Sequence, residues 1–239
     1  MTPKILPCGD SALSFQLGED IDDETNARVI ALAAALAIDR PRGILEIVPT
    51  YRSLLVQYDP EVIRGAALET LLLTRFSGLR QGRETGRRWS VPVVYGGQTG
   101  QDLEEIARLK GISPQEVMAL HSGAEFRVYM IGFQPGFTYL GGLPEALHCP
   151  RLAQPRQSIA AGAVGIGGQQ ANINSVAGPS GWRYLGWTPL VSFDPAREDP
   201  FLFRAGDRIC FRPVDMEEAK DLAARIATGK TVIVPEAGR

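Results

Sequence analysis

Hydrophobic residues in the first part of the chain follow strand and helix periods in turn. Leu13, Phe15 and Leu17 alternate with polar residues, which predicts a strand. Asp22 and Asp23 suit the positive end of a helix dipole, and apolar residues then recur at helical spacing. The next predicted elements are short apolar strands at 44–48 and 54–58, a helix after residue 60 and an alternating strand at 89–93. The order strand, helix, strand, strand, helix, strand is that of a ferredoxin-like split βαβ unit.

Two short helices are predicted next, on either side of Gly111. Asp102 with Glu105, and Ser113 with Glu116, have the spacing of a capping box. The pair superficially suits a helix-turn-helix reader of DNA, but the second helix lacks a basic face. A helical hairpin packed on a barrel is the better interpretation.

The remainder of the chain predicts a closed β-structure. Short apolar segments are punctuated by glycine and proline, as in a barrel or sandwich. They lie at 126–133, 163–166, 190–193 and 209–211, followed by a helix near 216–227 and a terminal strand at 231–234. We therefore expect an α+β chain with a small first domain over residues 1–88 and a barrel domain over 89–239. The polar stretch 78–88 is a loop or the linker between them.

Composition narrows the class of protein. The formal net charge of the 239 residues is −2, so no global field recruits nucleic acid or an anionic membrane. The amino terminus lacks a charged start followed by an apolar core, and the longest apolar run, which ends at Ile38, is too short to span a bilayer. The widely spaced Cys8, Cys149 and Cys210 form no CxxC pair, which fits a reducing compartment. We expect a cytoplasmic protein.

Two adjoining stretches are rich in glycine and proline, with aromatic and amide side chains among them. The first runs from Gly132 to Leu143 and the second from Pro155 to Leu190. A chain tolerates such dense glycine where its backbone turns tightly or approaches a ligand or another chain. With Phe137, Tyr139 and Trp182 as walls, the composition suits a concave polar site on β-structure. A barrel with many bends and no ligand is an equal alternative.

Motifs for self-contained catalysis are scarce. The glycines from Gly162 to Gly168 precede no lysine and form no GxGxxG pattern, which argues against a nucleotide fold. The two histidines, His121 and His148, support a metal site poorly. Cys149 beside His148 is a weak nucleophile candidate because adjacent side chains usually point apart. His121 is expected to satisfy carbonyls at a helix end, and the catalytic residues stay unassigned.

Several sequence blocks in one order resemble the allophanate hydrolase subunit 1 family. They include GFQPGFTYLGGL, PRQSIAAGAVGIGGQQ, GPSGW, GWTPL and AGDRICF. The front half is similar through PCGDSALSFQLG, EIVPTYRSLLVQYDP and VPVVYGGQTGQDLEEIA, so the likeness extends to about Pro213. That family includes the B subunit of 5-oxoprolinase, the KipI-type kinase inhibitors and part of the carboxyltransferase region of urea carboxylase. The resemblance implies a cyclophilin-like barrel in the second domain.

The likeness to the 5-oxoprolinase B subunit implies a non-autonomous component of a hydrolase that opens a cyclic lactam with ATP. The implied partners are a C-type homologue from the allophanate hydrolase subunit 2 family and a third, lactam-acting subunit. ATP is implied as cofactor, although this chain has no nucleotide motif of its own. Two alternatives stay open: a KipI-like inhibitor of a histidine kinase, and a carboxyltransferase component of the allophanate hydrolase or urea carboxylase type.

Candidate substrate-binding residues lie in the glycine-rich stretches. Arg156 suits bidentate binding of a carboxylate or phosphate, with a surface ion pair as an equal alternative. Gln169 and Asn172 suit a lactam through paired donors and acceptors, with ordinary turn hydrogen bonds as the alternative. The full set is Gln134, Pro135, Gly136, Arg156, Gly165, Gly167, Gln169, Asn172, Trp182, Trp187 and Thr188.

Three positions depart from the pattern usual in the family, where this region reads IYP…SPGGW and GRTPL. Asn174 replaces an aromatic residue, Ser180 replaces a glycine and Trp187 replaces an arginine. Loss of a cation changes which charged group a site can hold. Trp187 therefore predicts a less anionic or bulkier ligand than 5-oxoproline, or drift toward a binding role.

Overall fold

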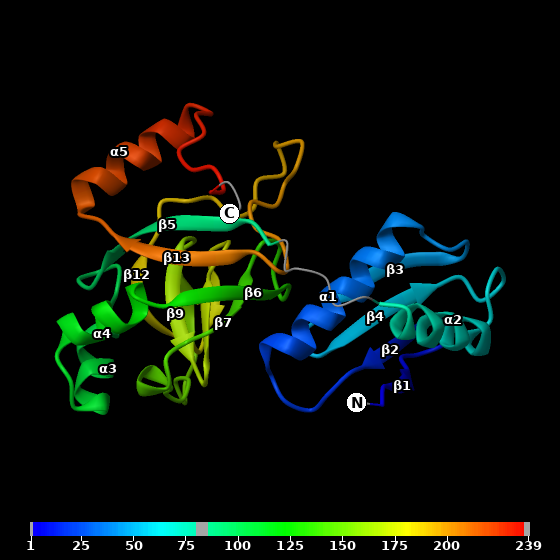
Figure 1. Cartoon of the computed structure of the whole chain (residues 1–239). Helices are drawn as coiled ribbons and strands as arrows, with labels where there is room; N and C mark the ends of the chain where they lie inside the picture. Colours follow the sequence, from blue (N-terminus) through cyan, green and yellow to red (C-terminus); the bar gives the residue numbers. More distant parts are fainter. Residues whose placement is uncertain (1, 80–85, 237–239) are drawn as a thin grey trace. The chain divides into compact units, whose positions relative to one another are not determined.

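The computed structural model describes residues 2–79 and 86–236. The chain divides into two compact units, Met1–Glu84 and Thr85–Arg239 (Figure 1). Each unit has a hydrophobic core of its own. The boundary expected between residues 88 and 89 falls at the first residue of β5 (Arg88–Tyr95).

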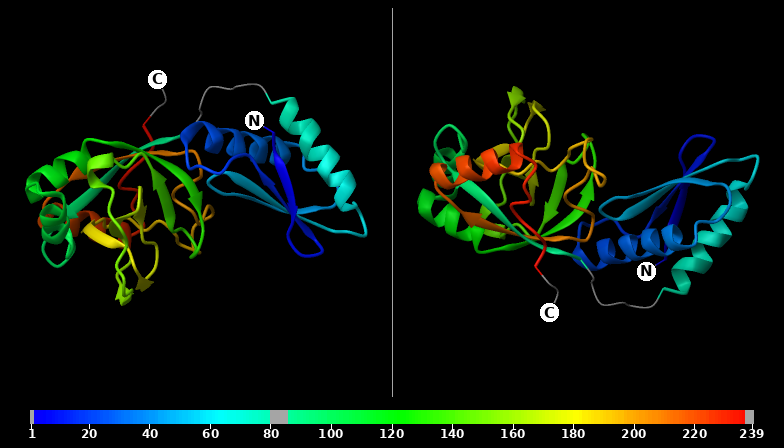
Figure 2. Two further views of the ribbon diagram at one scale, coloured as in Figure 1. Left: turned by 90° about the horizontal axis from the view of Figure 1, so that it is seen from below. Right: turned by 90° about the horizontal axis from the view of Figure 1, so that it is seen from above.

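The first unit is an antiparallel sheet with two helices on one face (Figure 2). The strand order is β1-β2-β4-β3, and Phe15 in β2 pairs with Ile5 on one side and Leu54 on the other. Helix α1 begins as expected, because the Asp22 carboxylate accepts the Thr25 amide at 2.8 Å. The elements are β1 (Lys4–Pro7), β2 (Ala12–Gln16), α1 (Asp23–Ile38), β3 (Ile44–Pro49), β4 (Ser53–Tyr58) and α2 (Gly65–Ser77).

The strand predicted at 89–93 does not belong to this sheet. It is part of β5, which pairs in parallel with β13 (Arg208–Pro213) in the second unit. The place beside β2 is taken by β1, which precedes β2 in the chain and pairs with it antiparallel. The expected ferredoxin-like order is therefore wrong in its last element, because that strand pairs in parallel with β13, which is far away in the sequence.

The second unit is built on a barrel that seven strands of the described residues close. Their order is β10-β7-β6-β13-β5-β12-β9, and β9 pairs with β10 to complete the ring. Alternate residues such as Val164, Ile166 and Leu185 fill the interior. A two-stranded arm of β8 and β11 projects from the barrel (Figure 2). The remaining strands are β6 (Glu125–Ile131), β7 (Thr138–Gly141), β8 (Arg156–Ile159), β9 (Ala163–Gly167), β10 (Gln170–Ile173), β11 (Gly178–Ser180) and β12 (Arg183–Trp187).

The predicted helical pair forms α3 (Leu103–Lys110) and α4 (Pro114–Ser122). Ser113 and Glu116 make the predicted capping box. Asp102 makes no capping bond, so the box expected with Glu105 is wrong. The other helices here are the short η1 (Glu145–Leu147) and α5 (Met216–Ala227), the latter close to its predicted bounds. Within the described ranges, no helix combines the length and apolarity needed to cross a membrane.

Two segments predicted as strands lie outside the barrel. Residues 190–193 contribute one isolated bridge, from Phe193 to Phe201, and 231–234 form no strand. Their apolar composition favours strands, but a closed barrel offers no free edge for another strand to join. These two predictions are therefore wrong for a topological reason.

Candidate active site

Two glycines of β9 face outward on the barrel, where β9 lies between β10 and β12. Val164 and Ile166 of β9 point into the core, so Gly165 and Gly167 lie on the opposite face. A Cβ on Gly165 would lie 2.7 Å from the Asn172 Oδ1 atom, and a Cβ on Gly167 would lie 2.9 Å from Arg151 Cγ. Glycine is thus required here because neighbouring side chains use the space that a Cβ would fill.

An aromatic cavity of about 350 Å³ lies on this side of the barrel. Phe137, Tyr139 and Trp182 form its wall, with ring centroids 4.7 Å apart for the first two and 6.1 Å from Trp182 to each. Its volume falls in the range of small-molecule sites, about 300–1,000 Å³. The lining residues are Phe133, Phe137, Tyr139, Arg151, Leu152, Pro155, Pro179, Ser180, Gly181 and Trp182.

A tight turn presents Phe133 at the edge of the cavity. Among the described residues it is the one non-glycine residue with positive φ, at 66°. The Gln134 amide donates to the Gly132 carbonyl at 2.8 Å, which closes a γ-turn around Phe133. The ring stays 72% exposed and meets Phe137 edge-on at 5.8 Å. Such backbone strain persists where the surroundings fix it, often at ligand sites.

Arg151 supplies the cation of the cavity. Its guanidinium carbon lies 4.4 Å from the centre of the Trp182 ring, in a cation–π contact. Within the described part of the chain, no carboxylate forms an ion pair with Arg151. The guanidinium therefore keeps N–H donors for a ligand carboxylate while its contact with Trp182 holds it at the cavity.

Arg156, the cation expected from the sequence to bind ligand, is engaged elsewhere. Its two terminal nitrogens bind the Asp102 carboxylate at 2.9 and 2.6 Å. Asp102 is 1% exposed and also accepts the Tyr184 amide at 2.7 Å. Both terminal nitrogens of Arg156 are thus occupied by a buried carboxylate, and this ion pair links β8 to the start of α3.

Ser180 reaches the cavity from β11 and is hydrogen-bonded behind it. Its Oγ atom lies 2.8 Å from the Tyr184 hydroxyl and accepts the Trp182 amide at 3.2 Å. Burial raises the pKa of Tyr184, so this hydroxyl stays protonated at neutral pH. Burial also raises the pKa of Tyr139, partly offset by the nearby charge of Arg151. The polar side chains in the cavity lining are therefore the hydroxyls of Tyr139 and Ser180 and the guanidinium of Arg151.

The structure distributes the predicted site residues over three surroundings. Trp182 lines the aromatic cavity, Gly167 packs against its Arg151 and Trp182 side chains, and Gly165 packs against Asn172. Gln134 sits over Gly178 of β11, and Gly136 packs against Phe193. The remaining candidates lie elsewhere: Pro135 and Gln169 are exposed, Thr188 is buried, and Trp187 donates to the Ala161 carbonyl at 2.9 Å.

The structure also shows the surroundings of Asn174 and Ser180, two positions that depart from the usual family pattern. Asn174 is buried, and its amide donates to the Ala160 and Val176 carbonyls at 2.9 Å each, so it holds a loop. Ser180 lines the cavity, as above. Arg151 was missed in the sequence because nothing local connects it with Trp182. Only the fold brings the two together.

The other titratable candidates lie outside the cavity lining. His121 is fully buried and its ring stacks on Phe211. Its Nδ1 atom forms a hydrogen bond of 2.7 Å with the Tyr95 hydroxyl. It does not cap helix carbonyls, contrary to the expectation, and burial lowers its pKa to about 3. Burial also raises the pKa of the Cys149 thiol. In the described ranges, no group of three or more histidine, cysteine or acidic side chains is arranged for a metal ion.

The glycine run does not fit a phosphate. Its backbone forms β9, which pairs with β10 on one side and β12 on the other. A phosphate loop needs free amides that converge on the anion, whereas these amides belong to a ladder. The residues of this run therefore do not fit the ATP that the sequence resemblance implied.

Comparison with known proteins places this architecture in a family. Residues 3–203 match the carboxyltransferase domain, subdomain C and D. The 5-oxoprolinase B subunit of Bacillus subtilis (strain 168) is 39% identical over 219 residues, covering 87% of this chain and 91% of the relative. The protein of that name from Escherichia coli O157:H7 is 40% identical over 207 residues, covering 86% of this chain and 93% of the relative.

Solved structures share the fold. TTHA0988 aligns with a TM-score of 0.77 at 39% identity over 85% of this chain, which spans 40% of the length of that protein. Kluyveromyces lactis urea carboxylase aligns with a TM-score of 0.81 over 98% of this chain, at 22% identity and across 24% of that protein, a likeness of fold alone. The match over residues 3–203 confirms the resemblance found in the sequence, and the chain belongs to the carboxyltransferase domain family, subdomains C and D.

Proposed function

We propose that this chain is the B subunit of an ATP-dependent 5-oxoprolinase in the cytoplasm. The observation that carries the proposal is its identity of about two residues in five with proteins of that name, along nearly their whole length. The three free cysteines are consistent with a reducing compartment. The partners would be a C-type homologue from the allophanate hydrolase subunit 2 family and a third, lactam-acting subunit.

The aromatic cavity is the proposed substrate site within this subunit. 5-Oxoproline carries a compact lactam ring and a carboxylate. The rings of Phe137, Tyr139 and Trp182 offer flat apolar faces to the lactam. Arg151 would hold the carboxylate, and the Ser180 hydroxyl lies in the same lining as a partner for the amide.

The cavity supports binding rather than complete catalysis. Of the described residues, those that line it include no histidine, cysteine or carboxylate. Opening a lactam needs an activating group for a resonance-stabilised amide. We therefore assign the activating chemistry, and the ATP that drives it, to the assembled complex and not to this chain alone.

Reconstitution tests the proposal directly. The chain is co-expressed with candidate C-type and lactam-acting subunits, and 5-oxoproline-dependent ATP hydrolysis is measured for each single protein and for the mixture. We expect stable co-purification and activity from the mixture alone. Equal turnover by this chain in isolation, or no complex with any candidate subunit, would contradict the assignment.

A further inference from the structure

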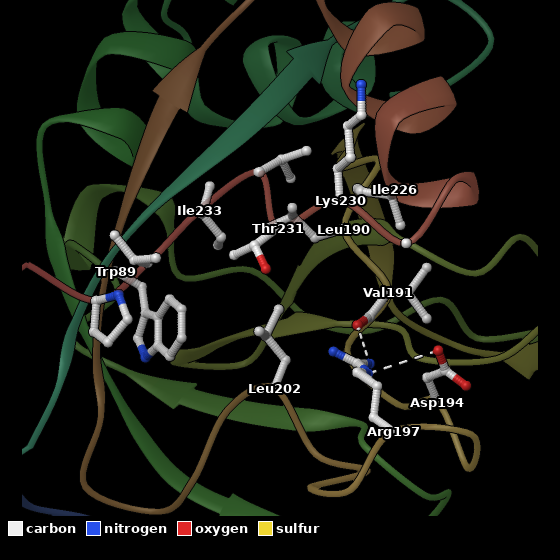
Figure 3. A pocket seen from close by; sticks show the side chains of 14 residues that line it. Trp89, Leu190, Val191, Asp194, Arg197, Leu202, Ile226, Lys230, Thr231 and Ile233 are labelled. Atoms are coloured by element: carbon white, nitrogen blue, oxygen red, sulfur yellow. Dashed lines mark hydrogen bonds and ion pairs between the residues drawn. The ribbon is translucent and has the colours of Figure 1, made fainter.

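A second cavity, of about 360 Å³, lies beneath the C-terminal end of the chain. Residues 229–235, here called the strap, form one side of it (Figure 3). Trp89, Leu190 and Leu202 form the other side. Among the described residues, none lines both this strap cavity and the aromatic cavity. Its volume is that of a site for a small molecule.

The strap cavity follows from barrel closure. The strap has β-branched residues but no free edge to join, so it crosses the barrel without ladder hydrogen bonds. Val232 and Ile233 pack against the barrel core. Beyond the strap, the Glu236 amide donates to the Arg88 carbonyl at 2.7 Å, and its carboxylate pairs with the Arg88 guanidinium at 2.9 Å. The Glu236–Arg88 contacts thus fix the chain just after the strap, and the cavity lies between the middle of the strap and the barrel.

One donor at this cavity lacks an acceptor. Arg197 donates through Nη2 to the Val191 carbonyl at 2.6 Å. Its Nε atom is buried without a hydrogen-bond partner, and the nearest acid oxygen, Oδ2 of Asp194, is 3.7 Å away. A buried guanidinium N–H without an acceptor is unfavourable. Most of the described lining is apolar, and its one carboxylate, that of Asp194, lies beyond hydrogen-bond distance, so a ligand oxygen is the group that would satisfy this N–H.

We propose that the strap cavity binds a small monocarboxylate with an apolar body. A carboxylate oxygen would accept the Arg197 Nε–H, and the body would pack between Trp89, Leu202 and Ile233. Figure 3 shows the Thr231 hydroxyl on the cavity side of the strap, where it offers a second donor. The Lys230 ammonium points away from the cavity in the same view. This site does not depend on the function proposed above.

Titration of the full chain with 3-phenylpropionate tests the proposal. Amide shifts of Thr231 and Val232 are followed by NMR, and affinity is measured by calorimetry. We expect saturable shifts at the strap and weaker binding of 3-phenylpropionamide. Arg197→Gln should weaken binding about tenfold or more, the scale of a charged hydrogen bond. Lys220→Gln removes the same charge from an exposed side chain of α5 that does not line the cavity, so its affinity should equal that of the wild type.

Two further variants separate the possible failures. Ile233→Phe fills the cavity without touching Arg197, so it decides the matter if Arg197→Gln fails to fold. Arg151→Gln changes only the aromatic cavity and should leave the strap shifts intact. The proposal is overturned by absent strap shifts, by wild-type affinity in Ile233→Phe or in folded Arg197→Gln, or by loss of binding in Arg151→Gln.

Discussion

The Asp102 carboxylate grips the Arg156 guanidinium at two points, 2.6 Å from Nη2 and 2.9 Å from Nη1. The same carboxylate accepts the Tyr184 amide, so one buried acid joins the start of α3 to β8 and β12. Because β8 pairs with β11, this contact also steadies the strand that brings Ser180 to the aromatic cavity. The ion pair therefore has a structural role, here called the fastener role: it holds the strands around the site together and does not contact a ligand.

Arg156→Ala should therefore reduce stability. The substitution leaves the Asp102 carboxylate, which is 1% exposed, without its ion-pair partner. Breaking a fully buried pair costs about 3–5 kcal/mol, and we expect roughly 2–4 kcal/mol because the Arg156 side chain is 28% exposed. Urea denaturation measures the change. Arg225→Ala, which removes an exposed pair with Asp221, is the control and should cost under about 1 kcal/mol; equal losses in both variants would refute the fastener role.

Gly167→Ala and Gly165→Ala should have different consequences. A Cβ on Gly167 lies 2.9 Å from Arg151 Cγ and 3.1 Å from the Trp182 ring, so both cavity side chains must shift and substrate affinity should fall. A Cβ on Gly165 lies 2.8 Å from the Arg183 carbonyl, a backbone atom that yields less readily, so this variant should lose stability instead. Paired melting and binding measurements test the contrast. The same profile in both variants would contradict it.

Trp187→Arg should fold without changing ligand preference. The indole donates to the Ala161 carbonyl and packs against Gly162, and it does not line the aromatic cavity. An arginine can replace the donor. Thermal melting establishes folding, and calorimetry with 5-oxoproline on the assembled complex gives the affinity. If the variant folds and binds 5-oxoproline clearly more tightly, Trp187 belongs to the substrate site, as the sequence predicts, and the present expectation is wrong.

Stability should decline as the solution is acidified below pH 6.5. Burial lowers the pKa of His121 to about 3, so between these values the unfolded chain binds a proton that the folded chain does not. The stabilisation is complete above pH 6.5 and falls by at most about 1.4 kcal/mol per pH unit toward pH 3. Denaturation at several pH values measures the slope. The double variant Tyr95→Phe, His121→Phe removes both hydrogen-bonding partners and should flatten it; an unchanged slope would exclude His121 as the source.

Local signals were sufficient to predict all the major helices. Ser113 and Glu116 show why, since a capping box involves residues three apart. Strand membership was harder, because β5 is assigned to the barrel by its pairing with β13, far along the chain. The segment 231–234 has strand composition, but the closed barrel leaves it no partner. Pairing is a property of the whole fold, which periodicity does not contain.

The candidate site was predicted in part for a similar reason. Glycine density and aromatic residues drew attention to the region of Trp182 and Gly167, where the aromatic cavity lies. Composition could not distinguish Arg156 from Arg151, because the distinction depends on the buried acid at Asp102. The acid lies outside both glycine-rich stretches, 54 residues before Arg156 in the chain, and only the fold brings the two together.

The KM of the assembled complex for 5-oxoproline, with and without Arg151, tests the central claim most directly. Arg151→Gln removes the cation over Trp182 and leaves the Asp102–Arg156 pair in place. KM is measured in the reconstituted complex beside Arg225→Gln, which removes an arginine from the exposed side of α5. We predict KM higher by about tenfold or more for Arg151→Gln alone, the scale of a charged hydrogen bond. Equal KM values for wild type and both variants would contradict the assignment of the aromatic cavity as the substrate site.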